Sequence, residues 1–189
     1  MEKPIPLLLC LAAMLSTGCA AERPAWADGR EVRSVRPAAV RQETGNIAER
    51  ILAVHNRERA AVGAPALAWD AALAASAAAY APQLAQLPTL AHSPRETRPG
   101  QGENLWRGTG GAFGLDEILG TWVGERRLFR GGTFPYVSTS RHWSDVSHYT
   151  QMIWPTTTAI GCAFHRGQRW DYLVCRYSPA GNVAGQRVP

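Results

Sequence analysis

The chain has 189 residues, of which 46% are hydrophobic and seven are tryptophans, so it can bury a core as one folded domain with appendages. This composition excludes a chain that is disordered throughout. The formal net charge is +5, and all but one of the 20 cationic side chains are arginines. The arginines are scattered and form no dense cluster with aromatic residues, so the charge suits an anionic envelope surface and does not predict nucleic-acid binding.

Residues 1–21 have the features of a signal peptide. Lys3 supplies the positive start, and an apolar run from Ile5 to Leu15 follows it. This run is too short to span a bilayer as a helix. The leader therefore predicts an exported protein, located in the periplasm, in the outer envelope or outside the cell.

The end of the leader allows two forms of processing. Gly18-Cys19 looks like the end of a lipoprotein signal, with cleavage before Cys19 and lipidation of that cysteine. Such signals usually have a large aliphatic residue where Ser16 stands, so ordinary cleavage near Ala20 or Ala21 is an open alternative.

A domain is predicted to begin near Asn46. The preceding residues 22–43 are rich in Arg, Ala, Pro and Glu, lack an apolar period, and are typical of a flexible tether. Thr44 or Asn46 is expected to cap the first helix, and Gly63 is expected to end it. Four residues share one face of this helix: Ile47, Ile51, Val54 and Glu58.

A second helix is predicted from Ala71, after a short extended link over residues 67–69. Asp70 is a good N-cap for it. Pro82 removes a backbone donor and is expected to kink or end the helix. Its apolar side is formed by four residues: Leu73, Ala77, Tyr80 and Leu84.

The middle of the chain alternates loops and helices. Residues 106–114 are glycine-rich but lack the preceding strand and the Lys-Ser/Thr of a phosphate-binding loop, so they predict a surface loop. Residues 115–129 are predicted to form a third helix, and residues 146–152 a short fourth one.

The C-terminal part predicts a hairpin. Residues 159–164 and 170–177 are strand-like and flank a turn at 166–168. Two cysteines belong to the leader, and the remaining pair, Cys162 and Cys175, suggests one disulfide in an exported chain, with two buried free thiols as the alternative. The two cysteines lie one residue out of register in this hairpin, so joining them needs a bulge or a different turn. Helices first and strands last favour an α+β layered domain.

Three motifs together resemble the CAP superfamily, which includes cysteine-rich secretory proteins, antigen 5 and plant pathogenesis-related proteins. They are G-E-N-L-W at 102–106, S-H-Y-T-Q-M-I-W-P at 147–155, and Y-L-V-C-R-Y-S-P-A-G-N-V at 172–183. The H-N-R-E-R segment at 55–59 also resembles the opening helix of these domains, where the histidine is structural. The resemblance covers residues 46–183 and implies a three-layer α-β-α sandwich with a small antiparallel sheet, in a bacterial member of the family.

In CAP domains, two histidines and two glutamates from separate segments converge in a cleft. The resemblance assigns this tetrad to four residues: His92 in L-A-H-S, Glu103 in G-E-N-L-W, Glu125 in T-W-V-G-E-R and His148 in H-Y-T-Q-M-I-W. Asn104 and Gln151 are expected to be supporting or structural amides. Trp122 and Trp154 are expected in the core.

Two imidazoles and two carboxylates form a nitrogen and oxygen ligand set suited to a weakly held Zn²⁺ or another divalent cation, with all four residues as ligands. The same set suits general acid–base chemistry, for which Glu103, Glu125 and His148 are the candidates. Ser144 and Asp145 precede His148, but such a trio is no catalytic triad without the geometry. No compelling nucleophile is present.

The sequence therefore favours an exported ligand-binding module for a lipid, a sterol or a cell-envelope component, with residues 131–143 forming apolar walls of the cleft. A metal-dependent hydrolase of peptide, lipid or envelope polymer is one alternative, and a structural envelope protein is another. The lack of a nucleophile and of a local H-E-x-x-H motif favours binding over catalysis. The protein is expected to be a monomer that contacts a membrane only through lipidated Cys19.

Overall fold

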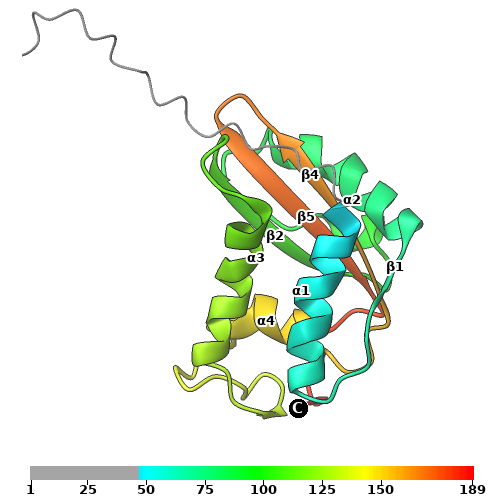
Figure 1. Ribbon diagram of the computed structural model, residues 1–189, viewed down its shortest axis with the longest axis vertical. Helices are drawn as coiled ribbons and strands as arrows, with labels where there is room; N and C mark the ends of the chain where they lie inside the picture. Colours follow the sequence, from blue (N-terminus) through cyan, green and yellow to red (C-terminus); the bar gives the residue numbers. More distant parts are fainter. Residues whose placement is uncertain (1–46) are drawn as a thin grey trace, which may run out of the picture. The chain divides into compact units, whose positions relative to one another are not determined.

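A four-stranded sheet lies between two layers of helices (Figure 1). The computed structural model describes residues 47–189, so the predicted signal peptide, tether and helix caps at Thr44 and Asn46 lie outside the described residues. The strand order is β1-β4-β5-β2. The strands are β1 (Ala68–Trp69), β2 (Gly102–Thr109), β4 (Ala159–Arg166) and β5 (Trp170–Ser178). Only the β1–β4 pair is parallel. The predicted α+β sandwich is confirmed, but its sheet is mixed and not wholly antiparallel as expected.

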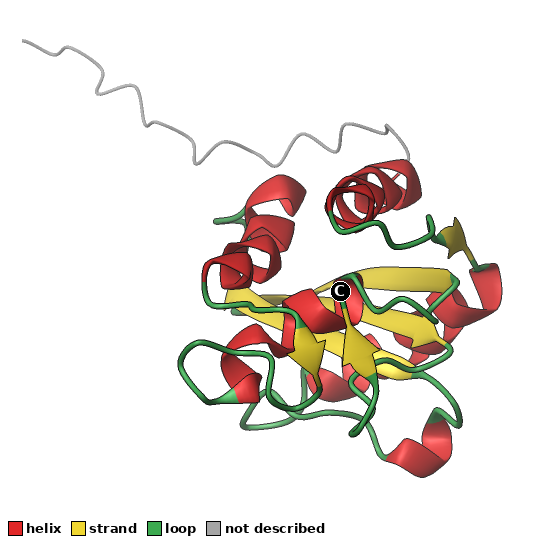
Figure 2. Cartoon of the chain, turned by 90° about the horizontal axis from the view of Figure 1, so that it is seen from below, coloured by secondary structure: helices red, strands yellow, loops and turns green. Residues whose placement is uncertain are grey.

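Helices cover both faces of this sheet (Figure 2). One face carries α2 (Ala71–Leu84). The other carries three helices: α1 (Ile47–Ala61), α3 (Leu115–Gly124) and α4 (Ser147–Met152). Three short 3-10 turns complete the described chain: η2 (Arg95–Thr97) between α2 and β2, η3 (Glu125–Arg127) after α3, and η4 (Trp143–Val146) before α4. A second, two-stranded sheet pairs β3 (Gly132–Thr133) with β6 (Arg187–Val188).

The alternation of side chains along β5 divides the interior into two cores. Leu173, Cys175 and Tyr177 face α1, α3 and α4, whereas Tyr172 and Val174 face α2. The predicted apolar side of α2 is buried as expected, and its start lies so close to β4 that a Cβ on Gly161 would meet the Ala74 nitrogen at 2.2 Å. Both tryptophans assigned to the core, Trp122 and Trp154, are buried.

The first helix buries only part of the predicted face, because Ile51 and Glu58 are buried as expected, Val54 is partly buried and Ile47 is not. Ile47 is 44% exposed, and the buried residues of α1 are Ile51, His55, Glu58 and Arg59. Arg59 donates to the carbonyl oxygens of Met152, Trp154 and Thr157 at 2.8–3.1 Å, so its buried charge is solvated by main chain. Gly63, with φ of +74°, ends the helix as predicted.

Three predicted boundaries are wrong. The third helix stops at Gly124, and η3 replaces its last turn. Strand β2 continues to Thr109 because its residues pair with β5 up to Trp170, so only the end of the glycine-rich segment is a loop. Helix α2 runs on to Leu84, two residues beyond Pro82, so Pro82 lies within its last turn and does not end it.

The hairpin has a different register from the predicted one. Pairing extends to Arg166 and Asp171, which places the turn one residue later and sets Cys162 directly opposite Cys175. The two cysteines form a disulfide without a bulge. Within residues 47–189, none of the helices is both long and apolar enough to cross a bilayer.

Candidate functional site

A cleft of about 840 Å³ opens where β2 begins. Both predicted histidines, His92 and His148, line it together with Glu103, whereas Glu125 does not. Glu103 and Asn104 are consecutive on β2, so their side chains project to opposite faces of the sheet. One histidine–glutamate pair is therefore built on the α2 side of this edge strand and the other on the α4 side.

The Glu103 carboxylate on the α2 side is fully buried and surrounded by donors. Its Oε1 atom accepts from His92 Nδ1 at 2.7 Å and from the Ser93 amide at 3.0 Å. Its Oε2 atom accepts from the Ser93 hydroxyl at 3.1 Å and lies 2.8 Å from Arg176 Nη1. Arg176 stands directly opposite Glu103 on β5, where its guanidinium also lies over the ring of Tyr80.

These donors outweigh the cost of burying the charge. Burial alone raises the pKa of Glu103, but the hydrogen bond from His92 and the charge of Arg176 bring the pKa below its ordinary value. Glu103 is therefore ionised at neutral pH and fixes the orientation of the His92 ring.

The second pair is tied to a helix start. Glu125 Oε1 lies 2.5 Å from His148 Nδ1, and Oε2 accepts from the amides of His148 and Tyr149 at 3.0 Å each. These amides belong to the first turn of α4, where amides lack partners within the helix and a negative charge is stabilising. The His148 ring stacks on Trp122, with centroids 5.7 Å apart and planes 9° from parallel.

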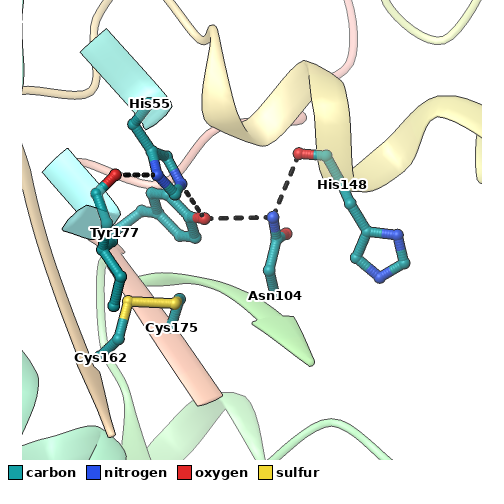
Figure 3. Close-up of a disulfide and its surroundings, with 7 residues drawn as sticks. His55, Asn104, His148, Cys162, Cys175 and Tyr177 are labelled. Atoms are coloured by element: carbon teal, nitrogen blue, oxygen red, sulfur yellow. Dashed lines mark hydrogen bonds between the residues drawn. A yellow bond between two sulfur atoms is a disulfide. The ribbon is translucent and has the colours of Figure 1, made fainter. Parts of the chain in front are cut away.

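A directional chain of hydrogen bonds fixes the position of His148 from the core (Figure 3). Asn104 Nδ2 donates to the His148 carbonyl and to the Tyr177 hydroxyl, each at 3.1 Å. The Tyr177 hydroxyl donates to His55 Nε2 at 2.9 Å, and His55 Nδ1 donates to the Ile51 carbonyl at 2.8 Å. Burial lowers the pKa of His55 to about 4, so this histidine is neutral and structural at neutral pH.

Gln151 forms the floor of the cleft against the C-terminal segment. Its Oε1 accepts from the Gly181 amide at 2.9 Å. A Cβ on Gly102 or Gly181 would approach the Gln151 side chain to 2.1 or 2.7 Å, so both positions need glycine for this contact. Asn104 and Gln151 are thus structural amides that also line the cleft.

The four predicted ligands do not form a single cluster. Among residues 47–189, no group of three or more His, Cys, Asp or Glu side chains is arranged to hold a metal ion. Each glutamate is instead engaged by the Nδ1 atom of its own histidine. Within residues 47–189, neither His92 Nε2 nor His148 Nε2 has a hydrogen-bond partner, so these two imidazole nitrogens are available to a ligand in the cleft.

Within residues 47–189, Ser144, Asp145 and His148 do not form a catalytic triad, in agreement with the sequence analysis, which did not favour one. His148 Nδ1 is bound by Glu125, while Asp145 accepts from the Ser140 hydroxyl at 2.7 Å. Ser144 lines the cleft but makes no contact with a base in the described part of the chain.

Sequence reasoning missed the cationic wall of the cleft. Arg95 and Arg98 line it beside His92, and Arg98 also donates to the carbonyls of Ser93 and Gln101. Arg176 was missed as well, although an arginine inside a strand that reads as buried must find a partner. Pairing the G-E-N-L-W strand with the Cys-Arg-Tyr strand would have placed Glu103 opposite it.

Another part of the cleft lining is apolar. Phe134 and Trp143, both from the stretch predicted to form walls, line the cleft with Val183. Trp143 is 47% exposed, and its ring meets that of Phe134 edge to face. Tyr136, from the same stretch, is 76% exposed and does not line the cleft.

Comparisons with a family model, with curated proteins and with solved structures all identify the same family. The model of the cysteine-rich secretory protein family, CAP, matches residues 52–177. Pathogenesis-related leaf protein 6 of Solanum lycopersicum is 38% identical over 146 residues, which cover 77% of this chain and 85% of that protein. The secreted protein RBT4 of Candida albicans is 39% identical over 141 residues, covering 73% of this chain and 36% of that protein. The crystal structure of NaASP2 with Zn²⁺ matches with a TM-score of 0.63 at 27% identity, covering 75% of this chain and 84% of that one.

Proposed function

Because the chain belongs to the cysteine-rich secretory protein family, CAP, we propose that it is an exported binding protein with a ligand cleft that takes up a divalent cation through His92 and His148. The carrying observation is that both histidines line one cleft while each Nδ1 is held by a carboxylate. Export is supported by the predicted leader and by the secretory family. Lipidation of Cys19, which lies outside the described residues, a bacterial source and a monomeric state stay predictions.

The donor set fits a weakly held metal. A carboxylate that accepts from Nδ1 selects the tautomer whose Nε2 lone pair is free, and it orients the ring towards a ligand. Two neutral imidazoles suit zinc, but structural zinc sites use four protein ligands, so water or the bound ligand has to complete this one. The glutamates therefore act as orienting groups in this proposal, and the two histidines are the ligands. The relative NaASP2 was crystallised with Zn²⁺.

The ligand class follows from the two walls. Arg95 and Arg98 make one part of the cleft lining cationic, whereas Phe134 and Trp143 make another part apolar. An amphipathic molecule such as a lipid or sterol, or an envelope component with an apolar part, would satisfy both walls. The volume of about 840 Å³ lies within the usual range for small-molecule sites.

The metal part is tested by calorimetric titration of zinc into the protein and into the H92A/H148A variant. The parent should bind zinc saturably, and the variant should lose this binding. The matched control is H142A/H165A, which removes two histidines that do not line the cleft and should leave the binding intact. Affinity should also fall in acid, because protons compete for the same nitrogens. Equal zinc binding by both double variants would refute the two histidines as ligands.

The ligand part is tested with labelled cholesterol and labelled oleate as probes. Trp143→Ala should weaken binding of the preferred probe, whereas Tyr136→Ala, at the exposed position outside the cleft, should not. If neither probe binds, or if both variants bind equally well, cholesterol and oleate are excluded as ligands of this cleft.

A further inference from the structure

A second concave surface lies at the far end of the sheet from the cleft. It has a volume of about 400 Å³ and is lined by the hairpin turn between β4 and β5 and by the residues that follow α2. Strand β2 begins at the cleft with Gly102 and ends opposite Trp170 with Thr109, so seven steps of roughly 3.3 Å separate the two places by about 23 Å. Ligands of the two surfaces would not touch.

This surface exists because the sheet extends beyond the helix that covers it. Helix α2 ends at Leu84, whereas β2, β4 and β5 run further. On the α2 face beyond the end of this helix lie Arg107 on β2 and Trp170 on β5, and the Trp170 ring is partly buried against the core beneath α2. The guanidiniums of Arg107 and Arg169 lie over the Trp170 ring, 5.3 and 5.0 Å from its centre. We call Arg107, Arg166, Arg169 and Trp170 the hairpin surface.

The charge of the hairpin surface is not neutralised by a carboxylate within residues 47–189. None of its three arginines forms an ion pair or a side-chain hydrogen bond with another residue of the described chain. The adjacent carboxylate, Asp171, is 3% exposed and accepts from the Gly111 amide at 2.8 Å, so it does not present its charge to this surface. In contrast, buried Arg59 and Arg176 bond to main chain or to carboxylate.

Arginine side chains without a carboxylate partner, next to an indole ring, indicate which kind of ligand would bind here. Guanidinium binds phosphate oxygens with paired hydrogen bonds, and indole rings favour the boundary between lipid headgroups and water. An exposed apolar side chain, Leu87, follows the pocket-lining Gln86 and is 40% exposed. The pocket has room for a single headgroup, whereas a charged polymer would favour a long groove.

We propose that the hairpin surface docks the protein onto a membrane with anionic phosphate headgroups. This contact is independent of the cleft and of any lipid on Cys19. Arg107 is about sixty residues from Arg166 and Arg169 in the sequence. The β2–β5 pairing brings it next to them, so this cluster of positive charge forms only in the folded protein.

The experiment is co-sedimentation of the protein with vesicles of phosphatidylcholine alone or mixed with phosphatidylglycerol. The test variant is R166Q/R169Q, and the matched control is R127Q/R130Q, which removes the same charge from two exposed arginines outside the hairpin surface. Each arginine near an anionic leaflet adds about fivefold to the affinity, so the test variant should bind the mixed vesicles roughly 30-fold more weakly. The control should bind like the parent. All three proteins share one N-terminus, so its contribution cancels.

Several results would overturn the proposal. Equal losses in the two variants would reduce the effect to net charge. Equal binding of the parent to both kinds of vesicle would remove the anionic headgroup as the ligand. Displacement from vesicles by inorganic phosphate at low concentration would indicate a soluble phosphate ligand, and loss of heparin retention without loss of vesicle binding would indicate a polyanion. Thermal unfolding of each variant checks that it is folded.

Discussion

The two histidine–glutamate pairs of the cleft use the same residue types in different settings. In the first pair, the Glu103 side chain is completely buried while His92 is 60% exposed. In the second, Glu125 and His148 are 18% and 31% exposed. In the first pair, the exposed His92 ring is bound by a carboxylate that also pairs with buried Arg176. In the second pair, both side chains are partly exposed, and the carboxylate also accepts from amides at the start of α4.

This difference separates stability from ligand binding. Glu103 neutralises buried Arg176, so the fold depends on its charge. Glu125 accepts from two amides of α4, which water would otherwise solvate in part. Both carboxylates orient a histidine, but only one of them is also a buried counter-ion. Substitutions in the two pairs should therefore have unequal effects on stability and similar effects on metal affinity.

The largest effect is expected for Glu103→Gln. This change leaves the Arg176 charge buried without a counter-ion, so the free energy of unfolding should fall by about 3–5 kcal/mol. Urea unfolding at neutral pH measures it. The double variant E103Q/R176M should lose less than the sum of the two single changes, because it leaves no unpaired charge. A loss for Glu103→Gln no larger than that for Glu125→Gln would contradict the distinction drawn between the pairs.

The next largest effect is a loss of folding stability in acid. It is caused by His55, which belongs to neither histidine–glutamate pair. His55 has a pKa of about 4 in the folded protein against 6.5 ordinarily, because it is buried. The unfolded chain binds the extra proton first, so stability is lost as the pH falls from 6.5 towards 4, by about 3 kcal/mol in total. Glu103 has a lowered pKa, so its contribution is present above its ordinary value and is lost only as the pH falls below it.

Urea unfolding midpoints measured between neutral pH and pH 4 test whether the contribution of His55 to stability is lost before that of Glu103. The His55→Gln variant should lose stability overall but show a flatter profile in this window. An unchanged profile in that variant would show that another group causes the acid sensitivity. Comparisons of the glutamates are therefore best made above pH 6.5.

Much of the fold could be predicted because apolar periodicity and capping are local signals. Asp70 accepts from the amides of Ala72 and Leu73, as a predicted N-cap should. The buried face of α1 could be predicted only in part this way, because His55 and Arg59 are buried by partners from remote segments. The hairpin register was one residue wrong because turn length is not readable from a polar Arg-Gly-Gln-Arg stretch.

The site was predicted in part, for a similar reason. Family motifs identified both histidines that line the cleft, but motif order does not say which atoms face a ligand. The glutamates bind Nδ1 atoms and amides instead of joining a ligand cluster. The additional partners of the glutamates are brought to them by strand pairing and by the start of a helix. Because these arrangements exist only in the folded protein, sequence motifs do not reveal them.

The smallest effect is expected for Glu125→Gln, which keeps one oxygen acceptor but removes the charge at the start of α4. The loss should be about 1 kcal/mol, the usual value of a helix-start acceptor with its charge effect. The matched control is Glu117→Gln, whose carboxylate accepts from the Gly114 amide at the exposed start of α3. Amide resonances of His148 and Tyr149 should shift in the first variant and not in the second. If Glu125→Gln costs as much as Glu103→Gln, then the second pair also holds the fold together, and the cleft has no pair that can change without unfolding risk.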